Sequence, residues 1–407
     1  MTANNTERLH ALDAARGFVL LLGIVFHATV SFLPAPPGVP VWIVMDNQRS
    51  FALAVLFYVT HIFRMTTFFV IAGFFAHMSF HKKGTRAFIR DRLKRIGIPL
   101  VVGWPILFAL IVAATIWGAT VMAHGKPFSP PRPYDGFPSF PLTHLWFLYV
   151  LLLLYAATLC TRSLILTLDR SGRVRTLADA LVRFVVANPF GLVLLAAPTA
   201  VTLYLSSKWL MWFGIMTPDM SLVPTAAASV GFGTAFAFGW LLHRQTDLLE
   251  IWRRRWLFNL LLAVGLTTAG LAFTGIAPLL TPAPHDWQTA VYAACYTLAI
   301  WRWTFAVIGM SLRFLANFSP VRRYIADASY WLYLIHVPLI MALQVAVSQL
   351  AWPWWAKFAF ILGIAFPLMF ASYHLLVRYS FIGAILNGRR ESRSKSAIVQ
   401  PAIQEAL

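Results

Sequence analysis

The chain has 407 residues, of which 59% are hydrophobic and only 12% are charged. Soluble domains carry roughly 25% charged residues, so this composition excludes an ordinary soluble fold. Apolar runs of roughly 20 residues recur along the whole length, which predicts an all-α, polytopic membrane helix bundle. The net charge of +19 has two readings, nucleic-acid binding or membrane topology, and the distribution of the charges distinguishes them.

The first apolar run carries three polar residues where a membrane span favours none: Asp13, Arg16 and His27. At ~100° per residue, a helix brings His27 to within roughly 20° of the face of Arg16, about 16 Å further along the axis. Ionisable residues inside a span are costly, and they indicate a function or a buried pairing. The alternative is that Asp13 and Arg16 lie at the membrane interface and that His27 only packs.

The sequence contains ten apolar runs that we interpret as spans. In chain order they cover residues 11–33, 51–80, 96–118, 144–166, 188–206, 224–243, 256–275, 288–313, 328–350 and 355–380. Lysine and arginine cluster after spans two, four, six, eight and ten, and they are sparse in the alternate connections. By the positive-inside rule, both termini are then cytoplasmic. Topology therefore explains the basic charge, and no nucleic-acid partner is needed.

We expect residues 1–385 to form one integral-membrane domain and residues 386–407 to form a basic, disordered cytoplasmic tail. The proline-rich connection 119–143 is predicted to be an outer loop, because proline interrupts helices. The inner connection 167–187 is expected to hold a short amphipathic helix. Cys160 and Cys295 lie in apolar runs without metal-ligand spacing, so we expect no metal site.

Arginine and histidine are the ionisable residues that lie deepest in the apolar runs. Arg64 lies in the second run and Arg302 in the eighth, and an uncompensated arginine at such depth costs several kcal/mol. Almost no carboxylates lie inside the spans, whereas ion-coupled transporters usually place one near the midplane. Histidine is the natural general base near neutral pH, and arginine binds phosphate or carboxylate. This inventory favours group transfer over ion coupling.

Two further groups of polar residues are candidates for binding. Arg90, Arg92 and Arg95 lead into the third run, where they suit a phosphate-bearing ligand or merely anchor the span by positive-inside topology. Tyr333 and His336 lie one turn apart in the ninth run and share a helical face. His144 opens the fourth run, at the outer interface where aromatic residues are common.

In four ordered segments the sequence resembles the integral-membrane acyltransferase family 3. The segments are ALDAARGFVLLLGIVFHATVSF with Asp13, Arg16 and His27, then FFVIAGFFA, then RLKRIGIP with Arg92 and Arg95, and finally SYWLYLIHVPL with Tyr333 and His336. The segment HLWFLYVLLLLY lacks the glutamate that many acetylating members carry there. It resembles instead the branch of glucan biosynthesis protein C, which succinylates periplasmic glucans.

The resemblance implies a multi-pass O-acyltransferase of the bacterial cytoplasmic (inner) membrane. Such an enzyme moves an acyl group, acetyl or succinyl, from cytoplasmic acyl-CoA to a hydroxyl of an extracytoplasmic glycan or glycolipid. Acyl-CoA would be the donor substrate, and no cofactor would be bound permanently. His27 would act as the general base or, as the alternative, as the acyl carrier. Arg16 would orient the thioester or balance developing charge, and Asp13 would hold Arg16.

The remaining candidates are assigned to binding. Arg90, Arg92 and Arg95 would hold the phosphates of CoA. The candidates for substrate binding are Arg64, His144, Tyr333 and His336. The alternative function is a membrane transporter or flippase for an anionic or sugar-linked substrate, with Arg64, Arg302 and the histidines along its path.

Overall fold

The computed structural model describes residues 3–34, 41–123 and 140–388. Most of the predicted outer loop and nearly all of the predicted tail lie outside these residues. The described chain is helical and contains no strand. Its α-helices are α1 (Ala3–Thr29), α2 (Phe51–Lys83), α3 (Thr85–Arg92), α4 (Ile98–Met122), α5 (Trp146–Leu168), α6 (Arg173–Ala187), α7 (Leu192–Tyr204), α8 (Ala226–Leu242), α9 (Leu249–Arg254), α10 (Trp256–Thr274), α11 (Trp287–Phe314), α12 (Pro320–Val347), α13 (Trp354–Ser372) and α14 (Phe381–Leu386).

Short 3-10 and π segments join or extend several of these helices. The 3-10 segments are η1 (Val30–Phe32), η3 (Thr143–Leu145), η4 (Met211–Phe213) and η5 (His243–Leu248), and the π segments are η2 (Leu93–Gly97) and η6 (Tyr373–Val377). The segment η2 joins α3 to α4, so that one continuous helical stretch, Thr85–Met122, passes through the predicted arginine cluster.

Nine helical stretches in the described chain are long and apolar enough to cross a membrane. They correspond to nine of the ten predicted spans. The predicted span 188–206 contains α7, whose 13 residues are too few for a hydrocarbon core ~30 Å thick. Helices α6 and α7 are long and apolar enough to cross a membrane only when they are taken together, and the chain bends by 96° between them. Pro189 and Gly191, which lie between them, explain why this tenth element is broken. The helix expected in 167–187 is present as α6.

Local sequence signals explain where the central helices begin and end. The hydroxyl of Ser50 accepts a hydrogen bond from the backbone N–H of Leu53 and caps α2. Ser319 caps α12 in the same way, and Pro320 occupies its first turn. Helix α2 ends at Gly84, whose φ of 76° favours glycine.

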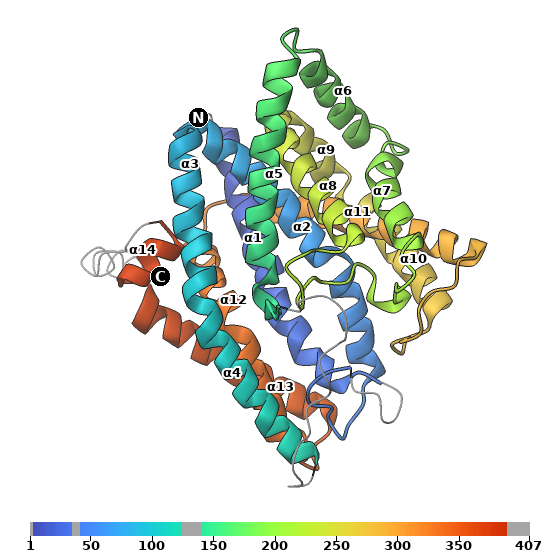
Figure 1. Ribbon diagram of the computed structural model, residues 1–407, viewed down its shortest axis with the longest axis vertical. Coiled ribbons are helices and arrows are strands. Elements are labelled where there is room, and N and C mark those ends of the chain that lie inside the picture. The colour runs from blue at the N-terminus through green and yellow to red at the C-terminus, as the bar shows by residue number, and fades with distance from the viewer. Residues whose placement is uncertain (1–2, 35–40, 124–139, 389–407) are drawn as a thin grey trace.

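Helix α1 lies at the centre of the bundle, where it packs against α2, α11, α12 and α13 (Figure 1). Helix α2 in turn packs tightly against α8. A Cβ atom on Gly73 of α2 would collide with the carbonyl oxygen of Phe236 in α8. This close approach is the role that small residues have in membrane helix packing. It accounts for the glycine in the segment FFVIAGFFA.

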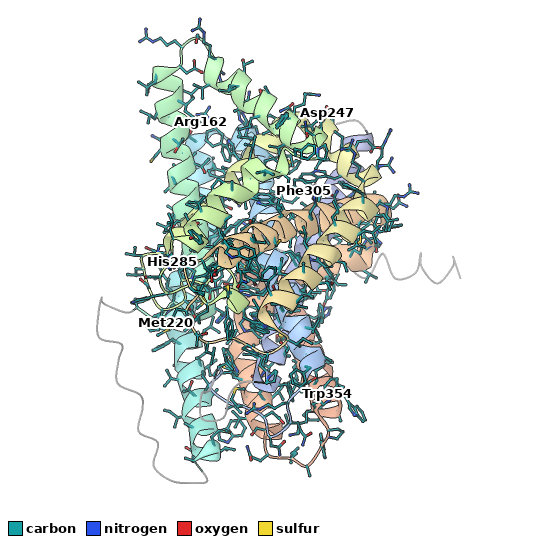
Figure 2. The ribbon with its side chains drawn as sticks, turned by 90° about the vertical axis from the view of Figure 1, so that its right-hand side faces the viewer. Arg162, Met220, Asp247, His285, Phe305 and Trp354 are labelled. Atoms are coloured by element: carbon teal, nitrogen blue, oxygen red, sulfur yellow. The ribbon has the colours of Figure 1, made fainter. Side chains whose placement is uncertain are left out.

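Helix α5 lies in front of α1 in the view of Figure 1, and α6 leaves from its upper end at an angle. Only 17% of the most apolar window of α5 is buried, compared with 67% for α11. Figure 2 shows Arg162 and Asp247 near one end of the molecule and Trp354 near the other. We call the end that carries Arg162 the Arg-rich end.

A fully buried lysine fixes the connection 41–50 at the opposite end. The Nζ atom of Lys357 in α13 donates hydrogen bonds to Asp46 Oδ1 at 2.7 Å, to Asn47 Oδ1 at 2.7 Å and to the carbonyl of Ser348 at 3.3 Å. Burial raises the pKa of Asp46 above its ordinary value, and the hydrogen bond from Lys357 opposes that shift. These bonds tie the connection to the ends of α12 and α13.

Candidate active site

One face of α1 leads from the Arg-rich end to a small cavity in the centre of the bundle. Arg16, Leu20, Gly23 and His27 follow one another at helical spacing on this face. Leu20, Gly23 and His27 line a cavity of about 40 Å³, which we call the His27 cavity. Arg16 lies about 16 Å from His27 along the helix axis. The spacing in the sequence therefore predicts this shared face correctly.

Three histidines from different parts of the chain meet at the His27 cavity. The ring centroids of His27 in α1 and His336 in α12 are 5.1 Å apart, and those of His336 and His144 in η3 are 5.4 Å apart. Tyr333 also lines the cavity, and its hydroxyl donates a hydrogen bond of 2.7 Å to the carbonyl of His144. The predicted substrate-binding residues and the predicted base are thus brought together.

Hydrogen bonds to carbonyl groups fix the tautomers of two of these rings. His336 Nδ1 lies 2.6 Å from the carbonyl oxygen of Tyr333, and His144 Nε2 lies 2.8 Å from that of Leu334. Because a carbonyl only accepts, each of these nitrogens is the donor. The other nitrogen of a neutral His336, Nε2, then carries a lone pair, and it has no hydrogen-bond partner in the described chain. His27 Nδ1 likewise has no hydrogen-bond partner in the described chain.

Arg64 supplies a positive charge to this cavity. Its guanidinium lies 4.4 Å from the ring centroid of Phe26, and its Nε atom has no hydrogen-bond partner among the described residues. No carboxylate within the described ranges forms an ion pair with it. Gly23 makes room for this side chain, because a Cβ atom there would overlap its guanidinium. An unneutralised cation at this depth is costly, and such a residue usually serves a function.

Gln344 holds the end of α1 that carries His27. Its buried side-chain amide donates hydrogen bonds to the carbonyl of His27 at 2.9 Å and to that of Ala28 at 3.3 Å. These carbonyls belong to the last turn of α1, where intrahelical partners run out. The oxygen of Gln344 accepts a hydrogen bond of 3.0 Å from Trp42 Nε1, and the indole ring of Trp42 lies 6.0 Å from the ring of His27. Gln344 therefore positions His27 and the aromatic wall beside it.

The backbone is strained next to His144. Thr143 has φ of 53°, and it is the only residue other than glycine with positive φ in the described chain. A β-branched residue is rarely found in this left-handed region, where the strain is of the order of 1–3 kcal/mol. A hydrogen bond of 2.9 Å from its N–H to the carbonyl of Asp219 helps to hold it. The conformation aims the following residue, His144, at the cavity.

Arg95 lies close to Arg16 and to Arg92 at the Arg-rich end, and Arg92 forms an ion pair of 2.9 Å with Asp91. Arg95 interacts electrostatically with both Arg92 and Arg16, and its Nε atom donates to the carbonyl of Leu386 at 3.1 Å. The hydroxyl of Tyr330 donates a 2.7 Å hydrogen bond to the carbonyl of Arg95. Because Tyr330 lies one turn from Tyr333 in α12, the arginine cluster and the His27 cavity are joined along α12 as well as along α1.

The other predicted residues of this end are placed differently. Arg90 is exposed on α3, whereas Arg92 and Arg95 are half-buried. Asp13 forms ion pairs with Arg16 at 3.2 Å and with Arg323 at 3.4 Å. Arg16 is therefore held as the sequence predicts, and Asp13 also connects α1 to α12 through Arg323.

Three residues of the site were not among the predicted ones: Gly23, Gln344 and Trp42. Gly23 could have been found, because it repeats the spacing that connects Arg16 to His27. Gln344 carries a weaker signal, as an amide in an otherwise apolar stretch of α12. Nothing in the sequence places Trp42 beside His27, because the contact depends on how the connection 41–50 folds back. No group of three or more His, Cys, Asp or Glu side chains in the described chain is arranged to hold a metal.

Comparison with known proteins shows the family. Residues 9–374 match the family described as acyltransferase domain. The chain belongs to this acyltransferase family. The match includes every residue of the His27 cavity and of the arginine cluster around Arg95. This is a multi-pass membrane enzyme of the acyltransferase class.

Several relatives of the chain share the name glucans biosynthesis protein C. The protein from Salmonella paratyphi B is 24% identical over 97% of this chain and 99% of its own length. That from Shigella dysenteriae serotype 1 is 31% identical over 38% of each chain, and that from Escherichia coli SMS-3-5 is 31% identical over the same shares. The chain thus spans little more than a third of these last two relatives. No solved structure matches the chain.

Proposed function

We propose that this protein is an O-acyltransferase that acts across the bacterial cytoplasmic membrane, with His27 as its base. The main support is the face of α1 that runs from the arginine cluster to the His27 cavity. A donor bound by its phosphates at one end of this face presents its acyl group at the other. The Arg-rich end faces the cytoplasm in this proposal, as the positive-inside rule expects.

Acyl-CoA is the proposed donor. Arg92, Arg95 and Arg16 bind its phosphates through charge-assisted hydrogen bonds. In this proposal the His27 cavity, which has only about 40 Å³ of space, widens when the donor binds. The pantetheine arm then extends past Leu20 and Gly23, and the thioester lies between Arg64 and His27. Arg90 contributes at most to the general positive field, because its side chain is exposed on α3.

In the proposed reaction, His27 removes the proton of an acceptor hydroxyl while the hydroxyl oxygen attacks the thioester carbon. The tetrahedral intermediate carries a negative oxygen, which the cationic side chain of Arg64 stabilises. The C–S bond then breaks, and the leaving thiolate takes the proton from His27 to give free CoA. His336 and Tyr333 orient the acceptor hydroxyl.

The proposed acceptor is an extracytoplasmic glucan or a related glycan or glycolipid. The support is the name of the relatives, glucans biosynthesis protein C, one of which aligns along nearly the full chain. The transferred group is acetyl or succinyl. The positive charge of Arg64 suits either the oxyanion of the intermediate or the free carboxylate of a succinyl group.

A transporter is the second candidate function, and the structure offers it less support. Arg302 donates hydrogen bonds to Asn259 Oδ1 at 2.9 Å and to the carbonyl of Pro189 at 3.2 Å. It lines neither the His27 cavity nor the larger groove described below. The two deep arginines therefore do not share a path through the described part of the bundle.

The test is acyl transfer by purified protein in proteoliposomes with acetyl-CoA or succinyl-CoA inside and a linear glucan outside. Mass spectrometry of the glucan and assay of free thiol measure the two products. We expect His27→Ala to lower transfer by about 10²- to 10⁴-fold, which is the usual contribution of a general base.

His285→Ala is the matched control, because His285 is exposed in the connection before α11, and it should retain wild-type transfer. Near-full activity of a folded His27→Ala protein would contradict the mechanism. Uptake of glucan without any CoA would support the transporter instead.

A further inference from the structure

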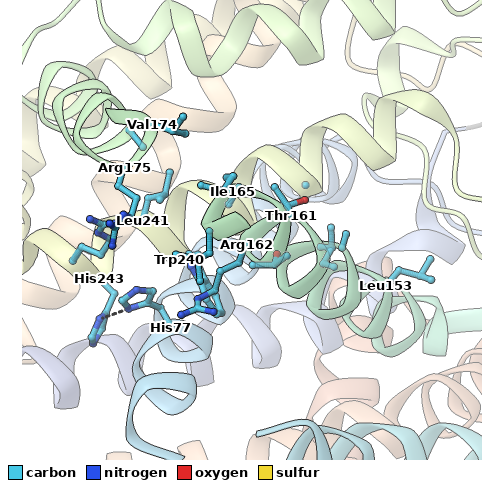
Figure 3. A pocket seen from close by; sticks show the side chains of 18 of the residues that line it. His77, Leu153, Thr161, Arg162, Ile165, Val174, Arg175, Trp240, Leu241 and His243 are labelled. Carbon is cyan, nitrogen blue, oxygen red and sulfur yellow. Dashed lines mark hydrogen bonds between the residues drawn. The ribbon is translucent and has the colours of Figure 1, made fainter. Parts of the chain in front are cut away.

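A second and much larger cavity opens at the edge of the bundle, between α5, α6 and α8. It encloses about 990 Å³ and shares no lining residue with the His27 cavity. We call it the α5–α8 groove; Figure 3 shows its lining, with Leu153 toward one end and Arg162, Arg175 and His243 toward the other. The proposed acyl transfer makes no use of it.

The walls of the groove are apolar and include large side chains such as Leu153 and Leu154 of α5. Ala157 in α5 and Gly233 and Ala237 in α8 also line it, and these small residues leave room between the two helices. The lining of α5 runs from Val150 to Leu166, which is about 24 Å at 1.5 Å per residue. One leaflet of hydrocarbon is about 15 Å thick, so the groove has room for the acyl chain of a membrane lipid.

Cationic and histidine side chains surround the Arg-rich end of the groove. Arg162 and Arg175 line it, and neither forms an ion pair with a carboxylate of the described chain. Arg244 lies beside them, but it is paired with Asp179 at 2.7 Å. His77 lies 2.9 Å from His243 between their Nδ1 atoms, shown by the dashed line in Figure 3. No carboxylate is among the described residues that line the groove.

We propose that the α5–α8 groove binds a membrane lipid with an anionic phosphate headgroup. The acyl chain lies between α5 and α8, and the phosphate lies between Arg162 and Arg175. A soluble anion would leave the apolar length of the groove empty, and an uncharged chain would leave the two guanidiniums without a counter-ion. Guanidinium groups bind phosphate with bidentate hydrogen bonds, and lipid phosphates lie where these groups are found, at the end of the spans.

Native mass spectrometry of the full-length protein in detergent tests the proposal. The protein is titrated with dioleoylphosphatidylglycerol, and with dioleoylphosphatidylcholine, which has the same chains without net charge. We expect one tightly bound phosphatidylglycerol and binding of phosphatidylcholine at least several-fold weaker. Arg162→Gln combined with Arg175→Gln should weaken phosphatidylglycerol binding by about tenfold or more.

Gly233→Leu tests the apolar part of the groove independently. The nearest atom to a Cβ on Gly233 is Leu154 Cδ2 at 3.8 Å, so the backbone has room for a side chain there. We expect the leucine to occupy part of the groove and lipid binding to fall about tenfold, with an unchanged Tm in detergent as the check on folding. Gly265→Leu is the matched control, because a Cβ on this exposed glycine of α10 has no atom within 4 Å. Arg313→Gln is the control for charge at the same end of the bundle.

Three outcomes would overturn the proposal. The first is binding of phosphatidylglycerol to the Arg162/Arg175 and Gly233 variants as to the wild type. The second is full displacement of the lipid by inorganic phosphate or by CoA, which would assign the groove to a soluble anion or to the donor. The third is loss of a dimer, rather than of a lipid, in Gly233→Leu. None of these outcomes bears on transfer by His27, which is measured separately.

Discussion

The His27 cavity and the α5–α8 groove differ in how they hold their polar groups. The first has about 40 Å³ of space and contains ring nitrogens and a guanidinium without partners. The second has about 990 Å³, apolar walls, and charges only at its rim. Enclosed polar atoms without partners are costly and are retained where a reaction uses them. An open groove with charges at the surface suits binding instead, so we propose that the first region carries out the chemistry and that the second binds a lipid.

After loss of His27 itself, loss of the charge in the His27 cavity should have the largest effect. We expect Arg64→Gln to lower kcat by about 10²- to 10³-fold, as for removal of an oxyanion donor, with little change in the KM for acyl-CoA. Arg302→Gln is the matched control, a deep arginine whose partners are Asn259 and Pro189. Steady-state kinetics measure both. If Arg162→Gln lowered kcat more than Arg64→Gln, the division between the two regions would be wrong.

The arginine cluster next to α1 should affect donor binding rather than chemistry. We expect Arg92→Gln and Arg95→Gln each to raise the KM for acyl-CoA by about tenfold, because each removes a charge-assisted hydrogen bond. The exposed Arg90 provides the control, and Arg90→Gln should change KM by less than about twofold. Equal effects at all three positions would indicate that only the general positive field matters.

Substitution of Gln344 should have a smaller effect, on kcat and not on KM, because Gln344 positions His27 and does not bind the donor. Gln344→Glu keeps an acceptor for Trp42 but removes the amide that donates to the carbonyl of His27. We expect kcat to fall by about tenfold while the KM for acyl-CoA stays unchanged. Gln349→Glu, an exposed amide on the connection after α12, should be neutral. A change in KM alone would show that Gln344 contacts the donor side instead.

Relief of the backbone strain at Thr143 should have the smallest effect on transfer. It should raise the stability of the folded protein while it lowers transfer. Glycine tolerates the positive φ of Thr143, so Thr143→Gly should stabilise the folded protein by about 1 kcal/mol. Transfer should fall a few-fold because His144 is aimed less firmly. Thermal unfolding in detergent and the transfer assay measure the two effects. A lower Tm would show that the side chain of Thr143 contributes more than its strain costs.

Much of this architecture could be predicted from periodicity and charge. Nine spans were recognisable as long apolar runs, and Arg16 and His27 were predicted to share a face because helical geometry alone determines it. The broken element α6–α7 was less predictable, since its apolar residues read as a span until the bend at Pro189 is seen. The orientation of the termini stays a prediction.

The site was predictable only where residues lie on one helix. Arg64, His144 and His336 were chosen as deep or interfacial polar residues, yet their meeting at His27 depends on the packing of α1, α2, η3 and α12. The contact of Trp42 depends on the buried bond between Asp46 and Lys357, which joins positions over 300 residues apart and leaves no local pattern. Arg90 was grouped with Arg92 because the two are close in sequence, but in the structure Arg90 is exposed and Arg92 is half-buried.

The size of the His27 cavity has a consequence for the energy metabolism of the cell. A space of about 40 Å³ holds about one water molecule, and it lies between the arginine cluster and the connection tied down by Lys357. A water column cannot run unbroken through it, and ions cross hydrocarbon only at high cost. In the proposed reaction, the acyl group therefore crosses the membrane without an open water path, so the membrane potential, worth ~2.3 kcal/mol per charge at 100 mV, is not dissipated.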